Sequence, residues 1–139
     1  MDAQRPRVAN QAVTDALPLA PAFERAVAQY LAEFGAARGA STHSLRAYRI
    51  DLEDFARFQA ARGVDSPAAV TPRALRAWLA ELDARELARP TIQRRLSAVR
   101  SFYKHLVRRG DVTQAPTAGL PRRRGERKLP RALSKEEVE

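Results

Sequence analysis

Cysteine is absent from the chain, which excludes a disulfide framework and a thiolate metal site. The two histidines, His43 and His105, lie far apart and lack the spacing of a zinc-binding pair. No GxxxxGK[ST] loop for a nucleotide is present, and the six glycines fall at expected helix ends or in loops. We therefore expect no metal, no cofactor and no small-molecule ligand.

Long apolar runs are also missing, so the sequence predicts no transmembrane helix. The N-terminus has no apolar segment of the kind that forms a secretory signal. A membrane surface attracts positive charge, but the apolar residues of the basic segment are needed for a core. We expect a soluble, cytoplasmic protein with no membrane partner.

Negative charge is scarce in the second half of the chain. No Asp or Glu occurs between Arg89 and Gly110. Residues 90–131 hold twelve Lys or Arg and two acids, a net charge of +10, while the whole chain carries +9 and the remainder therefore −1. Such a localised excess of one sign predicts a polyanionic partner.

Strand patterns are absent as well, and the apolar spacing predicts four helices over residues 21–38, 42–62, 72–85 and 90–110. Their starts carry Pro21, a Ser41 or Thr42 cap, and Thr71 followed by proline. Gly63 stands where a left-handed residue ends a helix. Residues 65–70 are expected to form a loop. At 139 residues and 45% apolar composition, the chain can bury one core.

The helix expected over residues 90–110 has two chemically distinct faces. Its inner face is predicted to consist of Ile92, Leu96, Val99, Tyr103 and Leu106, with Leu96 central enough that truncation to alanine costs roughly 2–5 kcal/mol. A solvated helix usually mixes both charges, whereas a cationic face that also carries hydroxyls and an amide suits a DNA major groove. That opposite face is expected to present Arg94, Ser97, Ser101, Lys104, His105 and Arg108, with Arg100 on its flank and Gln93 as the amide.

Two segments carry specific motifs. The first reads Ser44-Leu45-x-x-Tyr48-x-x-Asp51-Leu52-x-x-Phe55, and the second, which is the more specific, is TIQRRLSAVRSFYKHL at residues 91–106. Both resemble the N-terminal core-binding domain of Xer-type tyrosine recombinases, and the XerC-like branch more than the XerD-like one. Residues 129–138, with Leu129-Pro130 and LSKEEV, are similar to that family's interdomain linker and the start of its catalytic domain. The resemblance covers residues 22–139.

The resemblance implies an all-α, four-helix SAM-like bundle that clamps the DNA together with a catalytic domain. Its second and fourth helices would approach the major groove of a recombination half-site. In that family an Arg and His constellation and a tyrosine nucleophile, which forms a covalent 3′-phosphotyrosyl intermediate, belong to the catalytic domain. This chain alone is therefore expected not to be an enzyme. In Xer proteins four protomers, with a XerD-like partner, resolve chromosome dimers at a dif-type site.

The expected organisation is a flexible arm over residues 1–20, a core-binding domain over 21–110, and a basic interdomain linker over 111–133. Residues 134–139 would begin a catalytic-domain helix, capped by Ser134 with Glu137 three residues on. The chain stops within that turn, so we expect a piece of a longer protein. The third helix lacks the glycine that commonly follows it in the family, and Glu86 or a neighbour stands there.

Candidate DNA contacts divide by side chain. Arginines take bidentate contacts to guanine or phosphate, glutamine pairs with adenine, and hydroxyls and lysines bond to the backbone. The first turns of the second helix also carry the positive end of a helix dipole. The candidates are His43, Ser44, Arg46, Arg49, Thr91, Gln93, Arg94, Ser97, Arg100, Ser101, Lys104, Arg108, Arg122, Arg123 and Arg124.

Other polar residues are given structural roles. Arg95 is expected to extend over the helix surface with its head in water. Carboxylates Asp51, Glu53 and Asp54 are expected to form surface pairs, for instance Glu53 with Arg57. His105 is expected to be exposed. The tyrosines Tyr30, Tyr48 and Tyr103 lie on apolar faces and are predicted to be core or boundary residues.

Two rival interpretations stay open. The chain could be the core-binding domain of a phage or integron integrase, although residues 1–20 leave no room for a folded arm-binding domain. It could instead be a basic helical adaptor that binds an acidic protein through the arginine-rich tail. The hydroxyl and amide content of the residue 90–110 helix favours DNA over an acidic protein.

Overall fold

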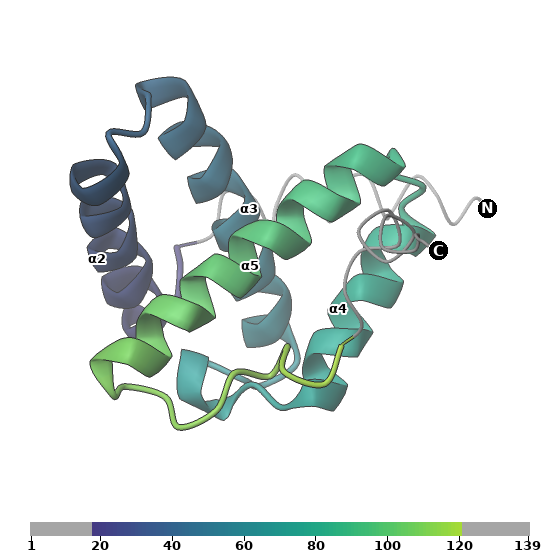
Figure 1. Ribbon diagram of the computed structural model, residues 1–139. Coiled ribbons are helices and arrows are strands. Elements are labelled where there is room, and N and C mark those ends of the chain that lie inside the picture. The colour runs from purple at the N-terminus through teal and green to yellow at the C-terminus, as the bar shows by residue number, and fades with distance from the viewer. Residues whose placement is uncertain (1–17, 121–139) are drawn as a thin grey trace, which may run out of the picture.

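The computed structural model describes residues 18–120, and these form four α-helices and one short 3-10 helix (Figure 1). The elements are α2 (Pro21–Arg38), α3 (Thr42–Ala61), η1 (Pro67–Ala69), α4 (Pro72–Ala84) and α5 (Arg89–Arg109). The all-α prediction is confirmed, and each helix end lies within one residue of its expected position. The expected loop over 65–70 contains η1. Among residues 18–120, no helix is both long enough and apolar enough to span a bilayer.

Local signals account for these helix ends. Ser41 Oγ accepts a hydrogen bond from the backbone N–H of Ser44 at 3.1 Å, and Thr71 Oγ1 accepts one from Ala74 N–H at 3.0 Å. Both bonds satisfy amides that have no partner inside a helix. Gly63 follows α3 with a φ of +89°, as predicted from its position.

Glu86, which follows α4, adopts a φ of +62° and is the non-glycine residue of the described region in left-handed conformation. Its backbone N–H donates to Asp83 O at 2.9 Å, which closes the turn after the helix. A Cβ in this region costs roughly 1–2 kcal/mol. The backbone at position 86 therefore favours glycine, although the residue that stands there is Glu86.

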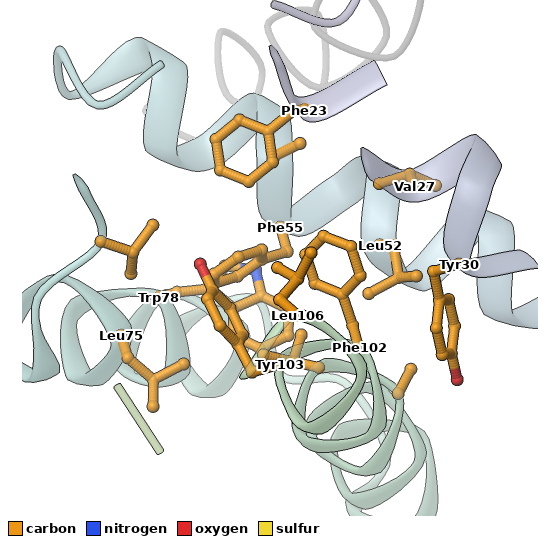
Figure 2. Close-up of a cluster of buried hydrophobic side chains, with 14 of the residues drawn as sticks. Phe23, Val27, Tyr30, Leu52, Phe55, Leu75, Trp78, Phe102, Tyr103 and Leu106 are labelled. Atoms are coloured by element: carbon orange, nitrogen blue, oxygen red, sulfur yellow. The ribbon is translucent and has the colours of Figure 1, made fainter. Parts of the chain in front are cut away.

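The four helices are arranged so that α5 crosses α3, with α2 and α4 on opposite sides (Figure 1). The core between them is rich in aromatic rings (Figure 2). Phe55 of α3 lies near its centre, with edge-to-face contacts to Trp78 at 5.0 Å, Phe23 at 6.0 Å and Tyr103 at 6.1 Å. Such ring pairs add to the free energy gained from burial.

The buried face of α5 differs from the predicted one. The centre of the buried arc lies roughly 60° from the expected centre, at 100° per residue. Leu96 is only partly buried, so the expectation that it is a central core residue is wrong. His105, expected to be exposed, is buried with 3% of its surface exposed. The reason is that α5 packs against α2, α3 and α4 at once. The residues it buries are Ala98, Val99, Phe102, Tyr103, His105 and Leu106.

Residues 111–120 return along the bundle after α5 (Figure 1). Val112, Pro116 and Thr117 are buried, and Leu120 packs against the core. The expectation of an extended linker is therefore wrong for these ten residues. The arm over 1–17 and the linker and catalytic start over 121–139 lie outside the described residues, so those boundaries stay predictions.

Candidate nucleic-acid interface

The junction of α3 and α5 is held by a paired guanidinium and carboxylate. Arg94 of α5 donates from Nη2 to Asp51 Oδ1 at 2.7 Å and from Nε to Asp51 Oδ2 at 2.9 Å. Asp51 is fully buried, while 44% of the Arg94 side chain is exposed. The hydrogen bonds to Asp51 raise the pKa of Arg94 further above its ordinary value. A side-on pair of this kind fixes the plane of the guanidinium.

Asp54, one turn along α3, connects three helices. Its Oδ2 accepts a hydrogen bond from Trp78 Nε1 at 3.0 Å, and its Oδ1 accepts one from Arg85 Nη1 at 2.9 Å. Arg95 Nη1 lies 3.1 Å from Oδ2, and Arg95 Nε lies 3.4 Å from Asp51 Oδ1. Arg95 is therefore largely buried against carboxylates, and the expectation that its head lies in water is wrong.

These contacts correct the interpretation of the acidic residues. Asp51 and Asp54 are buried and pair with arginines of α5 and with Arg85, which directly follows α4, so the expectation that they form surface pairs within α3 is wrong. Glu53 does pair within its helix, at 3.6 Å from both Arg57 and Arg49. The expected pair of Glu53 with Arg57 is thus confirmed. A buried carboxylate needs such partners because an unpaired buried charge is strongly destabilising.

The second half of α5 is tied to α2 instead. The hydroxyls of Ser101 and Tyr30 share a hydrogen bond of 2.6 Å. His105 Nδ1 lies 3.2 Å from Glu33 Oε1, while its Nε2 is buried without a hydrogen-bond partner in the described region. Burial lowers the pKa of His105. The candidate DNA contact Ser101 therefore faces α2 rather than pointing straight outward.

Several candidate cations remain on the surface. Lys104 and Arg108 of α5 and Arg46 of α3 are exposed, and none has an ion pair with another residue of the 18–120 region. Arg49 is half exposed and lies at the long distance of 3.6 Å from Glu53. Arg100 is partly buried. The face that lacks counter-charge is thus narrower than the sequence suggests, because Asp51 neutralises Arg94.

The remaining candidates are spread over both helices. His43 and Ser44 are exposed in the first turn of α3, where Ser44 Oγ lies 3.2 Å from the capping Ser41 Oγ. Thr91, Gln93 and Ser97 are partly buried on the first half of α5. Arg122, Arg123 and Arg124 lie outside the described residues.

None of the three tyrosines is placed as a nucleophile. Tyr103 is fully buried, its hydroxyl donates to Pro67 O at 2.7 Å, and burial raises its pKa. Tyr30 is buried, and desolvation raises its pKa too. Tyr48 stacks on Phe34 with ring centroids 5.2 Å apart. The prediction that these are core or boundary residues is confirmed.

Asp51 is the residue that the sequence-based interpretation missed. A signal for it existed, because Asp51 falls on the same stripe of α3 as Tyr48, Leu52 and Phe55. An acidic residue on an apolar stripe indicates a buried ion pair.

Comparison with known proteins identifies the family to which this all-helical bundle belongs. The chain belongs to the phage integrase N-terminal SAM-like domain family, whose model matches residues 27–110. The predicted SAM-like fold is thereby confirmed.

Several relatives are named tyrosine recombinases, which confirms the resemblance to Xer-type recombinases. The chain is 38% identical over 116 residues to "Tyrosine recombinase XerC" of Xylella fastidiosa (strain 9a5c), covering 84% of this chain and 40% of the relative. It is 36% identical over 121 residues to XerC of Xanthomonas campestris pv. campestris (strain B100), covering 87% and 38%. The chain thus matches about two fifths of the length of these relatives. No solved structure matches it significantly.

Proposed function

We propose that this chain is the DNA-binding N-terminal domain of a XerC-like, site-specific tyrosine recombinase, and that it clamps the duplex of a recombination half-site. The family membership and the recombinase relatives support this function. The observation that carries it is that three of the candidate cations, Arg46 on α3 and Lys104 and Arg108 on α5, are exposed and have no ion pair with another residue of the described region.

The candidate residues divide into two groups under this proposal. Lys104, Arg108 and Arg46 hold phosphates, because their charges are exposed. Gln93 and Ser97 have shorter side chains than lysine and arginine, so they suit contacts in which the helix lies close to the DNA. The basic run at 122–124 is proposed to follow the DNA backbone from one domain to the next.

For the whole protein we propose strand exchange by a tyrosine nucleophile outside this chain, with a covalent 3′-phosphotyrosyl intermediate. A second, XerD-like recombinase would complete a tetramer on a dif-type site to resolve chromosome dimers in the cytoplasm. A phage or integron integrase is the alternative parent. The names of the relatives support the Xer parent.

Competition binding tests the proposal. A fluorescein-labelled 30-bp duplex of random sequence is titrated with the 139-residue chain at low salt, and the anisotropy is measured. We expect saturable binding that unlabelled duplex reverses and an acidic protein such as ovalbumin does not. Failure to bind DNA at low salt would contradict the proposal. Reversal by the acidic protein alone would favour the adaptor interpretation instead.

A further inference from the structure

The contact with Asp51 engages only part of the Arg94 guanidinium. A guanidinium has five N–H groups, and the side-on pair engages one on Nε and one on Nη2. The outer edge, formed by Nη1 and the second hydrogen of Nη2, has no partner among residues 18–120. Since 44% of the side chain is exposed, this edge is open to a ligand.

The carboxylate that holds Arg94 is itself immobile. Asp51 is fully buried, and Arg95 Nε lies 3.4 Å from the same Oδ1 that accepts from Arg94. The contacts therefore fix both the position and the plane of Arg94. An arginine held in this way loses less side-chain freedom when it binds a ligand than an unrestrained one does.

We infer that Asp51 is a positioning residue for DNA recognition, which holds Arg94 so that its outer edge takes two acceptor atoms of the duplex. The acceptors are either O6 and N7 of a guanine or two oxygens of a phosphate, since both match the spacing of a guanidinium edge. This inference rests on the proposed function. It assigns a role in binding to a buried acid that makes no contact with DNA itself.

A purely structural role for Asp51 makes a different prediction, and Asp54 provides the matched control. Both are buried carboxylates of α3 that pair with arginines, but only Asp51 contacts Arg94. If Asp51 merely stabilises the bundle, Asp51→Asn and Asp54→Asn lower the thermal midpoint alike and leave the affinity of the folded chain unchanged. If Asp51 positions Arg94, only Asp51→Asn weakens binding.

The experiment measures the Kd of the 139-residue chain and its variants for a 30-bp duplex that the unmodified chain selects from a random library. Circular dichroism first establishes that each variant is folded at the temperature used. We expect Asp51→Asn and Arg94→Ala each to weaken binding at least fivefold, and the double variant to be no weaker than Arg94→Ala. Asp54→Asn should remain within twofold of the unmodified chain.

Two further measurements identify whether Arg94 contacts a phosphate or a guanine. If Arg94 contacts a phosphate, Arg94→Ala lowers the slope of log Kd against log salt by about 0.9. If it contacts a guanine, replacing one guanine by 7-deazaguanine, which lacks the N7 acceptor, weakens the unmodified chain but not Arg94→Ala.

Arg94→Lys keeps the inference testable even if Asp51→Asn does not fold. Lysine retains the charge but cannot offer one edge to Asp51 and a second to DNA. We expect it to bind more weakly than the unmodified chain. Unchanged affinity in Arg94→Lys, or in folded Asp51→Asn, would overturn the inference while the proposed function stands. Absence of DNA binding by the unmodified chain would instead overturn the proposed function.

Discussion

Tyr30 of α2 and Ser101 of α5 join hydroxyl to hydroxyl at 2.6 Å, across 71 positions of the sequence. Tyr30 also packs edge-to-face on Phe102 of α5, with ring centroids 5.7 Å apart. Together these contacts fix the rotation of α5 about its axis. They therefore decide which residues of α5 face the bundle and which face outward.

Removing this hydroxyl pair should destabilise the bundle modestly. Tyr30→Phe and Ser101→Ala are each expected to lower the free energy of unfolding by about 0.5–1.5 kcal/mol, the net value of one hydrogen bond. Because both remove the same bond, the double variant should cost less than the sum of the two. Urea unfolding of all four chains measures this coupling. Strict additivity would show that the bond does not contribute.

Loss of Asp54 should be far more costly than loss of its neighbour Glu53. Asp54→Ala leaves three donors, Trp78 Nε1, Arg85 Nη1 and Arg95 Nη1, without their acceptor. Breaking a buried pair costs about 3–5 kcal/mol. Glu53 makes only long pairs near the surface, so Glu53→Ala should cost less than about 1 kcal/mol. Chemical denaturation followed by Trp78 fluorescence compares the two, and equal losses would refute the role of Asp54.

Glycine at position 86 should stabilise the chain. Glu86 holds a φ of +62°, which glycine adopts without the steric cost of a Cβ. We expect Glu86→Gly to raise the free energy of unfolding by about 0.5–1 kcal/mol, after the greater entropy of glycine in the unfolded chain is subtracted. Ala80→Gly, at an exposed position inside α4, serves as the control and should destabilise by about 1 kcal/mol. A decrease in the thermal midpoint of Glu86→Gly would contradict this account.

Stability should fall as the pH is lowered through the titration of His105. Burial lowers the pKa of His105 in the folded state below its ordinary value of 6.5, which the unfolded chain retains. Glu33 and Asp111 oppose this effect, and Arg109 and Arg108 add to it. The unfolded chain therefore binds the proton more readily, so stability is complete above pH 6.5 and decreases toward the folded-state pKa.

The control for this pH dependence is His105→Gln, which has no titratable group at that position. Urea midpoints are measured between pH 5 and pH 8 for both chains. We expect the midpoint of the unmodified chain to fall more steeply below pH 6.5 than that of the variant. Parallel curves would show that the pKa of His105 does not differ between the folded and unfolded chain, which would contradict this account.

Local signals predicted the helix ends well, because a cap or a glycine acts within a few residues of itself. Ser41, Thr71 and Gly63 act as their positions indicate. The outward face of α5 could not be predicted in the same way. It depends on partners that are distant in sequence, namely Asp51 for Arg94 and Tyr30 for Ser101.

The regular spacing of apolar residues also did not reveal how much of the α5 surface is buried by the other helices. A helix that packs against one neighbour buries a narrow stripe, whereas α5 packs against three and buries polar residues beside that stripe. His105 lies there beside Glu33, and its ring contacts that of Tyr30 edge-to-face. The prediction of a polyanionic partner, by contrast, rests on net charge and does not depend on the packing.

Salt dependence of DNA binding by a double variant, Lys104→Ala with Arg108→Ala, tests the proposed contact surface most directly. These two exposed cations of α5 are expected to release counterions from about two phosphates, so the slope of log Kd against log salt should become shallower by about 1.8. Arg73→Ala with Arg76→Ala removes the same charge from the exposed surface of α4 and should leave the slope unchanged. Equal slopes for the unmodified chain and both double variants would contradict the claim that α5 faces the duplex.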